Sequence, residues 1–288
     1  MADALAASTG STPSGATPTP KWLPLAALAA AALFVVGFNG TMKTLWEAWQ
    51  NNENYSHGLL IPPIAAYLVW TKREELRALP LAPSWIGIAV LGLGVLLQLV
   101  GLRGDVSIFQ GYALVLVIAG LIWGWGGSAW IRALWFPVAF LLFMVPVFPW
   151  FMNEVSFRLK VVATTGAVAI AHAMGVAVTQ RGMDLFFPTG RLTIENACSG
   201  LNSLIALMAL GALFAWFGTG SGWRRTLLFM ASFPVAVIAN VIRLGAIFVM
   251  AAVTSTERAS GRFHDVGGFV LFGVALLLMA VVKRALRC

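Results

Sequence analysis

The stretch FPVAVIANVIRLGAIFVM, residues 233–250, decides the class of fold, because it is almost wholly apolar around one arginine. An apolar helix of about 20 residues crosses the roughly 30 Å hydrocarbon core of a bilayer. Similar runs recur along most of the chain, which is 59% hydrophobic and 10% charged. A soluble domain is usually about a quarter charged. The composition therefore excludes a soluble domain and predicts a membrane-embedded helical bundle.

We expect an all-α, polytopic transmembrane bundle of about eight spans. The predicted spans are 22–39, 58–71, 84–102, 107–125, 131–149, 198–217, 225–251 and 266–282. The second is short and contains Pro62 and Pro63, which favour a broken or re-entrant segment. The glycines spread through these spans permit close helix packing.

The basic residues predict how the spans are oriented, since loops rich in Lys and Arg stay in the cytoplasm. With the N-terminus inside, the cytoplasmic side receives Lys21, Lys72, Arg73, Arg77, Arg132, Arg224, Arg225, Lys283, Arg284 and Arg287. The short outer loops receive only Lys43, Arg103, Arg258 and Arg262. This asymmetry predicts a multi-pass bacterial inner-membrane protein with both termini in the cytoplasm. It also accounts for the net charge of +8 without nucleic acid as a partner.

Two segments are expected to lie outside the spans. Residues 1–20 are small, polar and proline-containing, so we expect a disordered cytoplasmic tail before the transmembrane domain, 21–288. Residues 150–197 form the main periplasmic segment. Its first part, roughly 154–174, is expected to be a helix in the outer interface.

The end of this periplasmic segment has a different pattern. VAVTQRGMDLFFPTGRLTIENA, residues 176–197, alternates and has turn signals at Arg181-Gly182 and Pro188-Thr189-Gly190. We expect a small β-hairpin or two extended strands that lead directly into Cys198.

Cys198 lies in ENACSGLNSLIAL, residues 195–207, where a polar stretch becomes an apolar span. A helix N-terminus carries free N–H groups and a partial positive charge, which favour a thiolate. The alternative is a small buried cysteine that only packs. Cys288 is cytoplasmic in this topology, so we expect no disulfide between the two cysteines.

Arg243 and His264 join Cys198 near the outer face. An arginine within a span is a candidate functional residue, although it can also snorkel or tie helices together. Asn240 lies one turn from Arg243 on the same helix face. His264 stands at the outer start of the last span, where the alternative is an exposed loop histidine. A thiol, a base that titrates near neutrality and a fixed cation are the groups needed for acyl transfer.

At these residues the sequence resembles the exosortase/archaeosortase family of membrane cysteine transpeptidases. Four segments match in order over roughly residues 40–285: Asn54-Tyr55-Ser56-His57-Gly58, Ala197-Cys198-Ser199-Gly200 with Ser203, Asn240-Val241-Ile242-Arg243, and His264. The resemblance implies that Cys198, Arg243 and His264 are catalytic, with no metal or cofactor. It implies substrates with a PEP-CTERM-type signal, which is a Pro-Glu-Pro-like motif, a transmembrane helix and a basic tail. Cleavage at the periplasmic face, transfer to an unknown acceptor and a link to exopolysaccharide production are also implied.

We expect the substrate to contact His57, Tyr55, Asn202, Asn240 and Ser199. Tyr55 and His57 either line the groove or cap the short second span. Asn202 stands where many family members carry arginine, which leaves substrate orientation and subfamily open.

Two other functions compete with the protease. A transporter or flippase would use Arg243 to bind a phosphate or carboxylate, and a non-catalytic subunit would serve envelope polysaccharide assembly. A transporter predicts polar residues near the midplane of several spans and inverted repeats. The polar residues instead cluster near one face, and no inverted repeat is apparent.

Overall fold

The computed structural model describes residues 23–194, 199–254 and 262–288. The chain divides into two units, residues 1–40 and 41–288. The first unit contributes the beginning of helix α1 (Leu23–Asn51), where the rings of Phe34 and Phe38 are 5.1 Å apart. The predicted tail, 1–20, lies outside the described residues.

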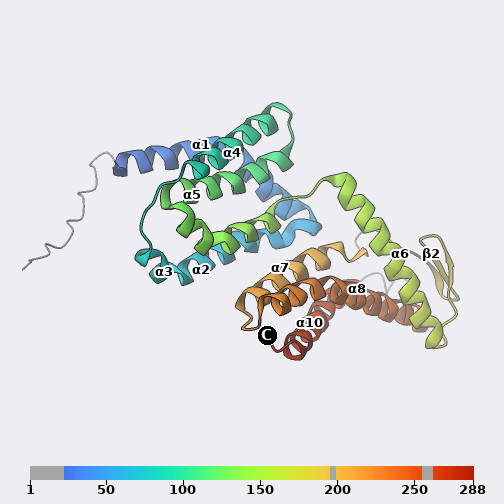
Figure 1. Ribbon diagram of the computed structural model, residues 1–288. Helices are drawn as coiled ribbons and strands as arrows, with labels where there is room; N and C mark the ends of the chain where they lie inside the picture. Colours follow the sequence, from blue (N-terminus) through green and yellow to red (C-terminus); the bar gives the residue numbers. More distant parts are fainter. Residues whose placement is uncertain (1–22, 195–198, 255–261) are drawn as a thin grey trace, which may run out of the picture. The chain divides into compact units, whose positions relative to one another are not determined.

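The second unit is mostly helical, with one small sheet (Figure 1). After α1, its elements are η1 (Glu53–Leu60), α2 (Ile61–Thr71), α3 (Arg73–Ala78), α4 (Trp85–Arg103), α5 (Ser107–Phe140), η2 (Leu141–Met144), α6 (Pro149–Ala173), β1 (Thr179–Arg181), β2 (Asp184–Phe187), β3 (Gly190–Thr193), α7 (Leu201–Phe217), α8 (Gly222–Val253) and α10 (Arg262–Ala285). The prediction of a mainly helical protein with a small β insertion is confirmed.

Three helices among the described residues are long and apolar enough to cross a membrane: Trp85–Arg103, Ser107–Met144 and Gly222–Val253. The shorter apolar helix α7 has 17 residues. The number of about eight spans therefore stays a prediction.

Helices α4 and α5 form an antiparallel pair, built on glycines at every seventh position of α4. Gly87, Gly94 and Gly101 are buried. A Cβ at Gly94 would lie 2.8 Å from Val117 Cγ2, and one at Gly101 would lie 2.9 Å from Gln110 Cγ. Glycine thus brings the two backbones close together, as small residues do in membrane helices.

Helix α5 covers the predicted span 107–125 and the first part of the predicted span 131–149, which continues into η2 and ends at Met144, before its predicted limit. Gly127, which lies between them, has φ 81° and ψ −171°, outside the helical region. The break is therefore where the sequence predicts it, but it is a sharp kink at one glycine rather than a loop. Ala82 packs there, and no residue with a Cβ fits.

The predicted second span, 58–71, is helix α2, which begins at Ile61 and ends at Thr71. Pro62 and Pro63 do not break it. They lie in its first turn, where proline needs no backbone hydrogen-bond partner. The part before Ile61 is the 3₁₀ helix η1.

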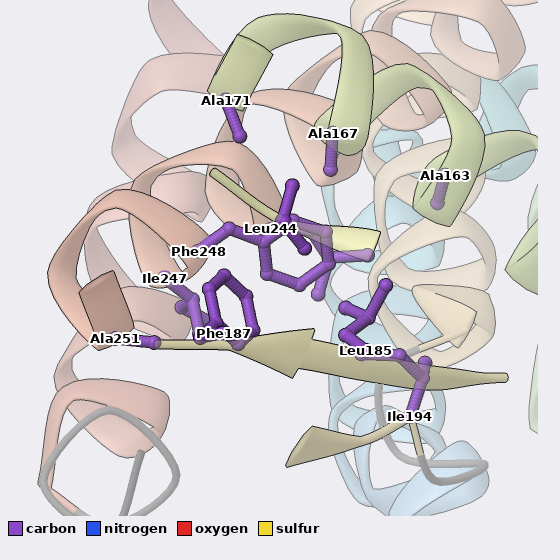
Figure 2. Close-up of a cluster of buried hydrophobic side chains, with 11 residues drawn as sticks. Ala163, Ala167, Ala171, Leu185, Phe187, Ile194, Leu244, Ile247, Phe248 and Ala251 are labelled. Atoms are coloured by element: carbon purple, nitrogen blue, oxygen red, sulfur yellow. The ribbon is translucent and has the colours of Figure 1, made fainter. Parts of the chain in front are cut away.

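Helix α6 and the sheet cover the C-terminal half of α8. A Cβ at Gly166 would meet Val241, and one at Gly245 would meet Ile170, so α6 and α8 run parallel. Eleven buried side chains form one cluster between these elements (Figure 2): Ala163, Ala167, Ala171, Val178, Leu185, Phe187, Ile194, Leu244, Ile247, Phe248 and Ala251. The helix predicted at 154–174 is thus present and packs along α8. Its position in the outer interface stays a prediction.

The sheet has three antiparallel strands in the order β1-β2-β3. Gly182, with φ 66°, lies at the first predicted turn, and Gly190 at the second. Two turns make three strands, so the expectation of a hairpin or two strands was one strand short. Leu185 and Phe187 alternate with exposed Phe186, which directs one face of β2 towards α6 and α8.

Candidate active site

The helix that follows Cys198 begins at Leu201, three residues later than the predicted span. Gly200 precedes it with φ 75°, a left-handed conformation that favours glycine. A Cβ there would lie 2.5 Å from Asn240 Cγ. Gly200 therefore serves both the backbone conformation and the close contact with α8.

Ser199 and Asn240 lie in a tightly packed region. Each is 3% exposed, and Ser199 Oγ accepts a hydrogen bond of 3.3 Å from Leu201 N–H. The space that they share with Leu159 and Val237 has a volume of about 10 Å³, near the lower limit for one water molecule. Their predicted contact with substrate stays a prediction, as does that of half-buried Asn202.

Helices α7, α8 and α10 meet at one level of the bundle. A Cβ at Gly211 would lie 2.7 Å from Ser232 Cβ and 3.6 Å from Met279 Cε. At the far end of α10, Cys288 packs against Gly218 and Gly220 in the connection between α7 and α8. These contacts show that α7 and α10 both run antiparallel to α8.

Distances along each helix from the shared level of Gly211, Ser232 and Met279 show where the predicted catalytic residues lie. At about 1.5 Å per residue, Gly200 lies about 16 Å from the Gly211 level along α7. On α8, Arg243 lies about 16 Å from Ser232, in the direction of Asn240. On α10, His264 lies about 22 Å from Met279, in the same direction. Because Gly200 directly contacts Asn240, Arg243 lies within about one helical turn of the level of Gly200. The backbone of residue 264 lies about one further turn in the same direction.

Arg243 is half-buried, one turn after Asn240. The apolar residues that follow it are explained by protein packing: Leu244, Ile247 and Phe248 are 1%, 7% and 0% exposed beneath α6 and the sheet. The number of apolar residues after Arg243 therefore does not show how deep Arg243 lies in the membrane.

Cys198 and the side chain of His264 lie outside the described residues, so the structure gives no distance between either and Arg243. His264 is the third residue of α10. Among the residues that can be described, no group of three His, Cys, Asp or Glu side chains could hold a metal ion.

Tyr55 and His57 contact the segment that follows α5, residues 143–147. Tyr55 Oη accepts a hydrogen bond of 3.1 Å from Val147 N–H, and His57 Nε2 lies 3.2 Å from Phe143 O. Burial raises the pKa of Tyr55, and burial lowers the pKa of His57 against the opposing effect of Phe143 O. These contacts are of the kind expected of a cap, and a role in substrate binding stays a prediction.

Two features near this segment were missed in the sequence. Trp49 Nε1 donates a hydrogen bond of 2.9 Å to Met144 O. A Cβ at Gly58 would overlap the Trp49 ring, which explains the glycine after His57. The role of Trp49 could not be inferred from the sequence, because tryptophans are common at the ends of membrane helices.

The described residues define a class: a mostly helical protein with three candidate membrane spans, in which Gly200, Arg243 and the start of α10 lie towards one end of α7, α8 and α10. A family model described as Transmembrane exosortase (Exosortase_EpsH) matches residues 49–281. The chain belongs to this family, which confirms the resemblance seen in its motifs. Membership implies a multi-pass membrane transpeptidase that acts on proteins with PEP-CTERM sorting signals. No curated protein and no solved structure matches the chain.

Proposed function

We propose that the protein cleaves the C-terminal sorting signal of its substrates through Cys198, Arg243 and His264, and passes the new C-terminus to an acceptor. The observation that carries the proposal is the register of the last three helices. Asn240 contacts Gly200, two residues after Cys198, and Arg243 lies one turn further along α8. The start of α10 extends to the same end of the bundle.

The chemistry follows from the three functional groups. The Cys198 thiolate attacks the carbonyl carbon of the scissile bond, and Arg243 stabilises the negative charge on its oxygen. His264 gives a proton to the leaving amine, and the C–N bond breaks to leave a thioester on Cys198. An acceptor nucleophile, assisted by His264, then attacks the thioester and restores the thiol.

The site faces the periplasm in this proposal, and both termini lie in the cytoplasm. Support comes from cations at the opposite end of the bundle. Lys72 and Arg225 lie 5.5 and 5.9 Å from the Trp216 ring centroid, and Lys283 lies 5.9 Å from that of Phe214. Cations gather on the cytoplasmic side of membrane proteins. The segment 150–197, with its α6 and three strands, then lies on the periplasmic side.

The test is co-expression with a protein that ends in a Pro-Glu-Pro motif, an apolar span and a basic tail. We expect Cys198→Ala, Arg243→Ala and His264→Ala to abolish its cleavage, while the enzyme still inserts. Removing a nucleophile or its base typically costs a factor of 10³ or more.

Matched variants control for each change. Cys288→Ser removes the other cysteine, at the opposite end of the bundle, and should leave cleavage unchanged. His172→Gln removes a histidine whose Nε2 lies 2.9 Å from Val178 O, and should also cleave. Normal processing by Cys198→Ala would overturn the thiol mechanism and favour a transporter or an assembly subunit.

A further inference from the structure

An apolar pocket lies at the end of the bundle opposite the proposed catalytic site. It has a volume of about 480 Å³ between the second part of α5, the last turns of α7 and the first turns of α8. Aromatic side chains dominate its lining, with Arg225 and Thr226 among its polar residues. Nothing in the proposed chemistry uses it.

The pocket wall is held by stacked rings. Phe136 and Trp216 stack with centroids 4.4 Å apart, and Trp135 meets Trp216 edge-on at 5.7 Å. Such contacts between large rings fix their positions. Stacked rings of α5 and α7 therefore form one wall of the pocket.

Two cations lie beside the same tryptophan. Arg225 is fixed there because its Nε and Nη2 each donate a hydrogen bond of 2.7 Å, to Ala215 O and Trp216 O respectively. Lys72 Nζ lies 5.5 Å from the Trp216 ring centroid and also bonds Glu75. The apolar cavity thus has Arg225 in its lining and Lys72 beside its Trp216 wall, so that cations lie near an apolar space, as a ligand with an apolar tail and an anionic head requires.

We propose that this pocket binds an anionic phospholipid of the surrounding bilayer, with one acyl chain among the rings and the phosphate at Lys72 and Arg225. The substrate's transmembrane helix is a poorer occupant. A helix is about 10 Å wide, and the basic tail that follows it would be repelled by the two cations. A zwitterionic lipid would match the apolar walls and gain less from the cations.

Lipid retention tests the proposal without reference to catalysis. The full chain is reconstituted in nanodiscs of phosphatidylglycerol and phosphatidylcholine in equal amounts, extracted with detergent, and analysed by native mass spectrometry. We expect wild type to retain phosphatidylglycerol preferentially. Lys72→Gln should reduce that preference about fivefold, the effect of one cation near an anionic lipid. Ala215→Phe should abolish retention, because Ala215 lines the pocket.

Two controls separate the pocket from general effects. Arg77→Gln removes an exposed cation of α3 that pairs with Glu74, and Ala89→Phe adds a ring to an exposed position of α4. Both should retain phosphatidylglycerol as wild type does. Equal retention of the two lipids by wild type, or unchanged retention by Ala215→Phe, would overturn the proposal. So would recovery of a prenyl phosphate in place of phospholipid from protein purified directly from cells.

Discussion

The most apolar 18-residue windows of helices α4 and α8 have the same mean hydropathy, 2.2, but they are buried to different extents. In the most apolar window of each, 22% of α4 and 50% of α8 is buried inside the protein. Helix α4 packs mainly on α5 through its glycines, whereas α8 contacts α6, α7 and α10. Hydropathy therefore predicts that a helix is apolar, and it does not tell whether lipid or protein covers that surface.

The difference has a consequence for the site. The polar residues of α8 that matter for the proposal, Asn240 and Arg243, lie where α6, α7 and the sheet converge. Asn240 is 3% exposed. On α4 a smaller share of the apolar window is buried, and its buried polar residue Gln98 bonds Thr41 of α1.

The largest expected effect comes from comparing a buried and an exposed phenylalanine within α8 itself. Phe248 is 0% exposed beneath the sheet, so Phe248→Ala should lower the free energy of unfolding by about 3–5 kcal/mol. Phe233→Ala is the matched control, because that ring is 47% exposed on the same helix. We expect it to change stability by less than about 0.5 kcal/mol. Unfolding in mixed micelles measures both, and equal losses would show that lipid and protein contacts of α8 are equivalent.

On α4, the glycines that face α5 should be the sensitive positions. Gly94→Leu would bring a side chain against the backbone and side chain of Val117 and force the helices apart. We expect a loss of about 1–3 kcal/mol, the usual cost of overpacking. Gly92→Leu provides the control, since no atom lies within 4 Å of a Cβ at that position. A loss in Gly92→Leu as large as that in Gly94→Leu would refute the one-sided packing of α4.

Much of this fold could be predicted from the sequence. The apolar run ending at 251 predicted α8, and Arg181-Gly182 and Pro188-Thr189-Gly190 predicted both turns of the sheet. The start of α7 was predicted three residues early, because hydropathy does not reveal the left-handed Gly200. Nor does hydropathy reveal the close approach of Asn240, which is 40 positions away in sequence.

The sequence named candidate site residues, whose roles stay predictions, and it misjudged the surroundings of Arg243. Arg243 stood out because charge is rare inside apolar runs. The same reasoning placed it within a membrane span, since the run continues to Met250. The structure shows that Leu244, Ile247 and Phe248 are apolar because they pack under α6 and the sheet. Only tertiary contacts distinguish these two reasons for an apolar sequence.

A buried polar network next to the glycines of α4 should contribute a smaller effect. Gln98 Nε2 donates to Thr41 Oγ1 at 2.9 Å, and Thr41 Oγ1 donates to Gln110 Oε1 at 3.2 Å. Thr41→Val should cost about 0.6 kcal/mol, the average of such bonds in membrane proteins. Thr165→Val, at an exposed position of α6, is the control. A loss above about 2 kcal/mol would mean that this network, and not glycine packing, holds α4.

The smallest effect concerns the end of α5, the partner of α4, where His57 lies against Phe143 O. Burial lowers the pKa of His57 below its usual 6.5. The unfolded chain therefore takes up this proton at a higher pH than the folded chain. Stability falls as the pH drops through 6.5 and levels off below the pKa of the folded state.

Thermal midpoints of wild type and His57→Gln, measured from about pH 8 to about pH 5, isolate this histidine. We expect the wild-type midpoint to fall more steeply than that of the variant, because only wild type has this group to protonate. A parallel decline in the two proteins would show that His57 is as accessible to protons folded as unfolded. The contact with Phe143 would then not secure the end of α5, and the alternative expectation, that His57 lines the substrate groove, would gain support.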